Sequence, residues 1–289
     1  MKGWAQWGLE RLPPRDQVPQ ELRSFWGLGE FRLHLNHSIH YVMSKSELDA
    51  VFDIQEKKKL LVFTTRVRRR DHQPFQSSDA IKYFLKSLTR KFPGNLKYLP
   101  RDYIEDPVVF ATNLPAELQS EYVRPLRREN FHAVIEASCL VPLAMGSPLQ
   151  PNEVNVNLSG GARLTPDGDH NAAFIDGGFA MKMPMRIFED DPRFREVALW
   201  AAADKTIVFC CDRQGSLWET SSRLRRLNAA PHVQTALDER RLFIIFPDHK
   251  IEAGFLCYDN SVTMRTFRRG QEQATRLLRS GELQRFLGV

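Results

Sequence analysis

The sequence is short of the features that mark secreted, metal-binding or membrane-spanning proteins. It has only four cysteines in 289 residues and no C-x-x-C spacing, which argues against a disulfide framework and a thiolate zinc site. No apolar run approaches the roughly 20 residues of a membrane span, because the best candidate, 197–211, is broken by Asp204 and Lys205. Glu10 and Arg11 precede any apolar leader segment, so we expect no secretory signal and a cytoplasmic location.

The chain also lacks the patterns of nucleic-acid-binding domains. Its formal net charge is +6, which favours anionic partners in general. The arginines occur in small separated clusters with acids between them, without an RNP-like aromatic pattern or a helix-turn-helix signal. These clusters are Arg66 with 68–70, Arg124 with Arg127 and Arg128, Arg223 with Arg225 and Arg226, and Arg268 with Arg269. We interpret them as solvated faces and expect no nucleic-acid partner.

The order of hydrophobic segments predicts an α/β fold. Residues 1–30 contain Pro13-Pro14 and Pro19 and are expected to be an irregular N-terminal segment, followed by one domain over 31–289. Strands are predicted at 60–65, 108–112, 174–175, 206–211 and 242–246, and helices at 79–92, 130–138, 217–227 and 263–280, with further helical spacing within 31–52. Because strands and helices alternate, we expect a largely parallel sheet.

The most informative stretch is Phe174-Ile175-Asp176-Gly177-Gly178. Its ordinary interpretation is a tight turn, since Asp-Gly between apolar residues is a strong hairpin signal. Upstream lies a helix that ends in Ala137-Ser138-Cys139-Leu140-Val141-Pro142. An A-S-x-x-x-P helix end followed by a strand bearing D-G-G resembles the patatin-like phospholipase family, and weaker similarity extends over 31–278.

This resemblance implies a patatin-like three-layer α/β fold and a Ser-Asp dyad that hydrolyses a lipid acyl ester without a histidine. Asp176 matches the aspartate that orients the serine and accepts its proton. The amides of a glycine-rich turn would stabilise the oxyanion. Gly177 and Gly178 are expected to let the turn after Asp176 adopt positive φ. The resemblance implies no cofactor and no metal ion.

The sequence departs from the family because it contains no G-x-S-x-G, the motif that carries the nucleophilic serine. The only serine in residues 1–30 is Ser24, which has no such motif around it. We therefore interpret the chain as an N-terminally incomplete patatin-like domain that is inactive as it stands. The alternative is a non-catalytic patatin-like scaffold that binds a lipid or a partner protein.

Other candidate residues have weaker support. Ser159 precedes Gly160 in a glycine-rich stretch that resembles an oxyanion loop, but an inserted loop is the favoured interpretation. Ser147 is followed by proline, which prevents it from leading into a helix start. Cys139 lies in an apolar run that would raise its pKa. The H-x-x-H-x-x-H histidines, His34, His37 and His40, drift around a helix instead of aligning for a metal.

The closing helix has apolar residues at helical spacing among several arginines. We favour a helix that packs on the domain and leaves its arginines in water. The alternative is peripheral contact with an anionic membrane through Arg265, Arg268, Arg269 and Arg276. Missing central strands would expose apolar sheet edges, so self-association of the chain is also expected.

Overall fold

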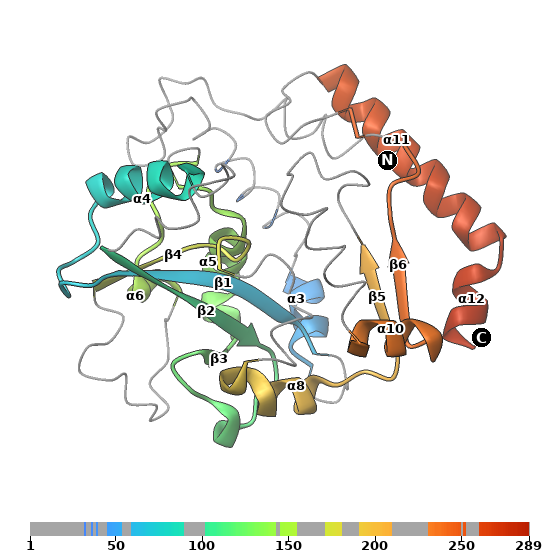
Figure 1. Cartoon of the computed structure of the whole chain (residues 1–289), viewed down its shortest axis with the longest axis horizontal. Coiled ribbons are helices and arrows are strands. Elements are labelled where there is room, and N and C mark those ends of the chain that lie inside the picture. The colour runs from blue at the N-terminus through green and yellow to red at the C-terminus, as the bar shows by residue number, and fades with distance from the viewer. Residues whose placement is uncertain are drawn as a thin grey trace. The chain divides into compact units, whose positions relative to one another are not determined.

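The computed structural model describes Arg32, Asn36, Ile39 and the ranges 45–53, 59–89, 102–142, 145–154, 171–180, 191–209, 231–249, 251–252 and 260–288. The chain divides into two compact units, Met1–Ala201 and Ala202–Val289, and each is described by itself (Figure 1). The single domain predicted over 31–289 contains this division. The predicted irregular segment 1–30 lies outside the described residues.

The first unit is built on a four-stranded sheet in the order β3-β2-β1-β4. Its strands are β1 (Leu61–Arg69), β2 (Tyr103–Ala111), β3 (Val123–Pro125) and β4 (Ala172–Asp176). β1 pairs antiparallel with both β2 and β4, while β2 and β3 are parallel. The α/β class is confirmed, but this sheet is mixed, and the prediction of a largely parallel sheet is wrong for it.

The reason lies in the connection between β1 and β2. A parallel connection needs a helix that returns along the face of the sheet. Here the chain leaves β1, forms α4 (Ser77–Thr89) and re-enters β2 at the same end of the sheet. The amide of Arg70 donates to the carbonyl of Asp102 at 2.9 Å, which closes the pair like a wide hairpin. The alternation of elements in the sequence does not reveal this return.

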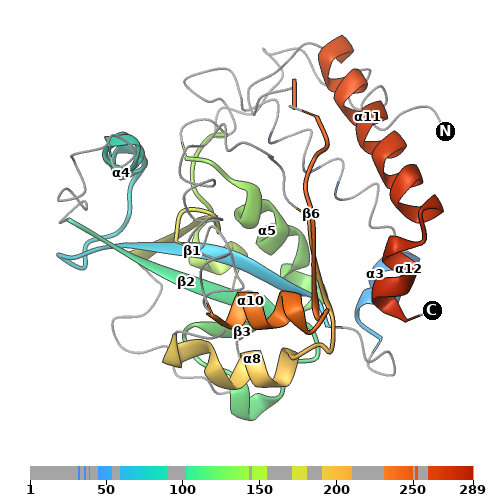
Figure 2. The same cartoon turned by 45° about the vertical axis from the view of Figure 1, so that its right-hand side comes forward.

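Both faces of the sheet are covered. On one face, Val62, Phe110 and Phe174 share a buried cluster with Phe131 and Val134 of α5 (Arg128–Cys139). On the other face, Val109 and Val123 pack against Phe194 and Val197. These last two residues belong to the 3-10 helix η5 (Pro192–Phe194) and to α8 (Arg195–Ala201). Figure 2 shows α5 and α8 on opposite sides of β1 and β2.

The outer edge of β4 is not open. The amide of Phe174 donates to Leu149 O at 2.9 Å, and the amide of Asp176 donates to Leu140 O at 2.9 Å. A strand edge with satisfied amides is a poor template for another chain. The expectation of self-association therefore gains no support from this edge, and it stays a prediction.

The remaining elements of the first unit are short. They are α3 (Lys45–Val51), the 3-10 helix η3 (Ala116–Leu118) and α6 (Pro151–Val154). The predicted helices at 79–92 and 130–138 correspond to α4 and α5, and the predicted strand at 60–65 corresponds to β1. The predicted helix at 217–227 lies outside the described residues.

The second unit contains a parallel two-stranded sheet of β5 (Thr206–Phe209) and β6 (Leu242–Ile245). Helix α10 (Pro231–Asp238) precedes β6, and α11 (Asn260–Arg279) and α12 (Glu282–Leu287) close the chain. The strands predicted at 206–211 and 242–246 and the helix predicted at 263–280 are confirmed within the described residues. Among those residues, no helix combines the length and the apolarity needed to cross a membrane.

Candidate functional site

Asp176 is the last residue of β4, where the strand leaves the sheet. It lies opposite Thr64 of β1, and its side chain is half-buried. Its backbone is held from two sides, because its amide donates to Leu140 O at 2.9 Å and its carbonyl accepts from Thr65 Oγ1 at 2.9 Å. The strand and the end of α5 therefore fix the position of this carboxylate.

The chain after Asp176 forms a tight turn, as the Asp-Gly pair predicts. The amide of Phe179 donates to Asp176 O at 3.2 Å, and the amide of Gly178 donates to Asp176 Oδ1 at 2.6 Å. No other hydrogen bond to this carboxylate occurs among the described residues. One carboxylate oxygen is thus oriented by the turn, and Oδ2 has no protein donor in the described part of the chain.

Thr65 of β1 contributes to this turn, although no sequence motif points to it. Its Oγ1 donates to Asp176 O and also approaches Gly177 O at 3.3 Å, and it accepts from the amide of Ala180 at 2.9 Å. One buried hydroxyl on β1 thereby connects three residues of the turn. The sequence feature that could have indicated this role is the pair of threonines, Thr64 and Thr65, which follows the apolar residues at the start of the strand.

The two glycines of the turn act differently from the expectation. Neither Gly177 nor Gly178 has positive φ, so that prediction is wrong. Gly177 is required by close approach, since a Cβ there would lie 2.4 Å from the carbonyl oxygen of Phe63. A Cβ on Gly178 would lie 3.0 Å from Asp176 Oδ1 and would press on the carboxylate. The amide of Gly178 is also bound to Asp176, so in this conformation it is not available to an oxyanion.

Burial raises the pKa of the Asp176 carboxyl above its ordinary value, and the hydrogen bond from Gly178 only partly opposes this shift. Among the described residues, no cation forms an ion pair with Asp176 to offset the cost of burying its charge. A half-buried carboxylate that has a raised pKa, and one oxygen without a donor in the described part of the chain, is the arrangement expected of a proton acceptor.

We expect Asp176→Asn to melt at a higher temperature than the wild-type chain at about pH 8, because the amide never carries the buried charge. A raised folded-state pKa means that this group's contribution to stability is present at acid pH and is lost as pH rises through that pKa. The difference in Tm should therefore shrink toward about pH 4. A gain of about 1 kcal/mol would correspond to about 2–4 °C.

The exposed Glu117 provides the matched control, since Glu117→Gln removes a charge that is not buried. It should leave Tm unchanged across the same pH range. An Asp176→Asn chain that melts like the wild type at every pH would contradict the raised pKa.

The end of α5 brings Ser138 and Cys139 near Asp176. Ser138 Oγ donates to Ile135 O at 2.7 Å and lies 3.7 Å from Cys139 Sγ, so its hydroxyl is engaged within the helix end. Cys139 is exposed by surface area, yet its thiol is partly desolvated. That desolvation and the charge of Asp176 together raise the pKa of the thiol. A thiol kept protonated is a poor nucleophile, as expected for a cysteine in an apolar run.

Of the other sequence candidates, Ser147 alone lies within the described residues. The carbonyl of Ser147 accepts from Arg32 Nη1 at 2.8 Å, and no hydrogen bond joins Ser147 to Asp176 among the described residues. Ser24, Ser159, Gly160 and the three histidines lie outside the described residues. The described residues contain no group of three His, Cys, Asp or Glu side chains placed to hold a metal ion.

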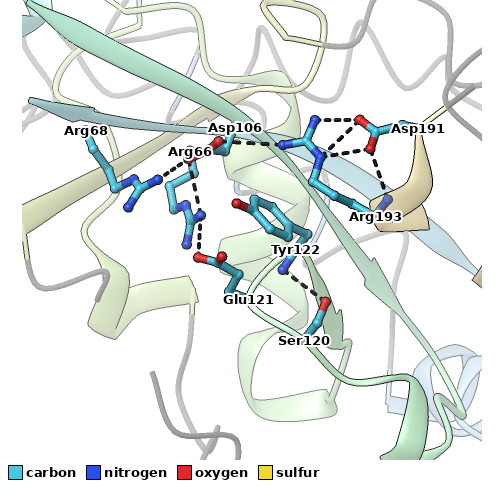
Figure 3. A network of polar contacts seen from close by, with 8 residues as sticks. All are labelled: Arg66, Arg68, Asp106, Ser120, Glu121, Tyr122, Asp191 and Arg193. Atoms are coloured by element: carbon cyan, nitrogen blue, oxygen red, sulfur yellow. Dashed lines mark hydrogen bonds and ion pairs between the residues drawn. The ribbon is translucent and has the colours of Figure 1, made fainter. Parts of the chain in front are cut away.

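A second polar cluster joins β1 and β2 to the segment before β3 and to η5 (Figure 3). Arg66 of β1 stands opposite Asp106 of β2, and Asp106 Oδ2 accepts from Arg66 Nη2 at 3.2 Å and from Arg68 Nη2 at 2.6 Å. Arg193 Nη1 approaches the other oxygen of Asp106 at 3.7 Å. One buried carboxylate thus serves three guanidinium groups.

Further acids and an aromatic ring complete this cluster. Glu121 accepts from Arg66 at 3.1 Å, and Asp191 accepts from Arg193 Nε at 2.9 Å. The ring of Tyr122 lies between the two arginines, 5.4 Å from the guanidinium carbon of Arg66 and 4.8 Å from that of Arg193. Since each of these arginines has an acidic partner, we interpret the cluster as structural. It also corrects the expectation of solvated arginine faces, because Arg66 is only 1% exposed.

Comparison of the chain with protein-family models, with curated proteins and with solved structures found no match. The assignment of a function therefore depends on the Asp176 turn and its surroundings.

Proposed function

We propose that this chain carries the aspartate-bearing part of a patatin-like lipid acyl hydrolase domain, with Asp176 as the acidic member of a Ser-Asp dyad. The observation that carries the proposal is the half-buried Asp176 carboxylate, which Gly178 holds through one oxygen and whose other oxygen has no donor among the described residues. A serine hydroxyl at the open oxygen would be oriented for attack on an acyl ester.

The electrostatics of Asp176 suit that role. In a dyad without histidine, the carboxylate accepts the serine proton as Oγ attacks the ester carbonyl, and returns the proton to the leaving alcohol. A carboxylate is a better base when its pKa lies closer to the working pH, and burial moves the pKa of Asp176 in that direction. The position of Asp176 at the end of a sheet strand also suits a substrate site on an α/β fold.

The packing around Asp176 is a second observation that supports the proposal. The D-G-G turn and the helix end that contains Ala137, Ser138 and Pro142 are the two segments on which the resemblance rests. The hydrogen bond from the Asp176 amide to Leu140 O joins these segments directly, although they are far apart in the sequence. Two motifs of one site are expected to meet in space, as these do.

This chain is expected to hydrolyse p-nitrophenyl esters and phospholipids no faster than buffer, because the sequence has no G-x-S-x-G serine. Loss of a nucleophile usually costs several orders of magnitude in rate. Ester hydrolysis and labelling by a fluorophosphonate probe would measure this, with Asp176→Asn as the matched variant. Hydrolysis that is robust in the wild type and lost in Asp176→Asn would show that another serine, with Ser159 the first to test, completes the dyad.

The second candidate function is a non-catalytic lipid-binding scaffold of the same family. It is favoured by an apolar cavity of about 290 Å³ in the second unit, lined by Phe209, Ile245, Ile251, Ala274 and Leu277 among others. This volume is at the lower limit of small-ligand pockets, about 300 Å³, so the expected ligand is no larger than a short acyl chain. Saturable binding of a short fatty acid, without ester hydrolysis and unaffected by Asp176→Asn, would favour this function.

A further inference from the structure

Helix α11 of the second unit has two kinds of arginine. Arg265 and Arg269 pair with Glu252, and Arg276 pairs with Asp248. These contacts also lower the pKa of Glu252 below its ordinary value, mainly through the hydrogen bonds from Arg269 and Arg265. Three arginines of the helix thus serve contacts inside the unit.

Arg268 and Arg279 are different. Both are exposed, and neither has a hydrogen-bond or ion-pair partner among the residues that the structure describes. They are about three helical turns apart, so they lie on one face of α11, separated by about 16 Å along its axis. These two cations lie on one helix face, with the exposed Glu272 between them, and they form a strip that carries more positive than negative charge.

Exposed apolar side chains accompany this strip. Phe267 is 55% exposed and Leu278 is 52% exposed, and each directly precedes one of the two unpaired arginines. The opposite side of the helix is occupied within the unit, because Gln273 Nε2 donates to Phe246 O at 2.6 Å and Gln273 Oε1 accepts from the amide of Asp248 at 3.2 Å. At 3.6 residues per turn, each of these four residues is expected about 120–140° around the helix from Gln273. Figure 1 shows α11 beside β6.

We propose that this outer face of α11, formed by Phe267, Arg268, Leu278 and Arg279, docks on an anionic lipid surface. Phosphate groups would neutralise the two arginines, while the phenylalanine and the leucine enter the boundary between headgroups and acyl chains. A nucleic acid would satisfy the arginines but would leave the Leu278 side chain without an apolar environment. The docking face belongs to the second unit, so the proposal does not depend on a catalytic role for Asp176.

The proposal assigns lipid binding to the unpaired arginines and not to the paired ones. The test compares two double variants of the full chain, each of which loses two positive charges. The first combines Arg268→Gln and Arg279→Gln, and the second combines Arg265→Gln and Arg276→Gln. Partition onto sedimented vesicles of phosphatidylserine and phosphatidylcholine is measured against vesicles of phosphatidylcholine alone. Thermal melts of both variants establish that each chain is folded.

We expect the first variant to lose about 25-fold in partition onto anionic vesicles, since each basic residue near such a surface contributes about a fivefold factor. The second variant should lose less than about fivefold. A third double variant, Phe267→Ser and Leu278→Ser, should also bind anionic vesicles more weakly. The salt dependence of its binding should be unchanged. Equal losses in the two arginine variants, or equal binding of the wild type to neutral and anionic vesicles, would overturn the proposal.

Discussion

Replacing Asp106 by alanine is expected to lower the free energy of unfolding of the first unit by about 3–5 kcal/mol. The carboxylate of Asp106 is 9% exposed, and it pairs with Arg66, whose side chain is 2% exposed. Its removal takes this acid from both Arg66 and Arg68, although Arg66 keeps its contact with Glu121. The measurement is urea unfolding followed by circular dichroism.

Asp49→Ala is the matched control for this prediction. Asp49 also pairs with an arginine, Arg128, but both side chains are about half exposed, at 50% and 46%. An exposed ion pair contributes about 0–1 kcal/mol, so the control should unfold almost like the wild type. Similar losses in Asp106→Ala and Asp49→Ala would mean that burial of the first pair has no energetic consequence.

Gly177→Ala is the second substitution with a large expected effect. The added methyl group would lie 2.4 Å from Phe63 O and 2.8 Å from Phe63 C, which are backbone atoms of the central strand and cannot rotate away. Either β4 or β1 must shift, and overpacking of this kind costs about 1–3 kcal/mol or more. We expect a lower urea midpoint and changed amide chemical shifts at Thr65 and Asp176.

Gly270→Ala is expected to stabilise the chain, in contrast to Gly177→Ala. Gly270 lies inside α11, and a Cβ there would meet no heavy atom within 4 Å. Alanine in a helix interior is more favourable than glycine by about 0.5–1 kcal/mol, so this variant should be slightly stabilised. If both glycine variants are stabilised, the close approach of Gly177 to β1 does not hold in solution.

Local sequence patterns were sufficient for the elements that carry the candidate site. The β-branched run at the start of β1, the helix α5 and the apolar residues before Asp176 all had clear periodicity or composition. The pairing of these elements was not predictable in the same way. The return of the chain after α4, closed by the Arg70 and Asp102 backbone contact, made the sheet mixed, and no local pattern encodes that contact.

The arginines show a second limit of the sequence. Arg66 belongs to a cluster of four arginines that looks like a solvated face, yet it is buried beside Asp106 and Glu121. Its partners are 40 and 55 positions away in the chain, so the cluster gave no sign of them. The role of Gly177 was hidden for the same reason, because the atom that excludes a side chain belongs to a distant strand.

The contact between Thr65 and the Asp176 turn also has a consequence for the order in which the chain folds. The two residues are 111 positions apart, so the contact closes a long loop, whose entropic cost delays its formation. β1 can pair with β2 much earlier in synthesis, but the side of β1 that receives β4 must wait until β4 has left the ribosome. The turn that positions Asp176 is therefore the last part of the sheet to assemble, and it should be the first place where incomplete folding appears.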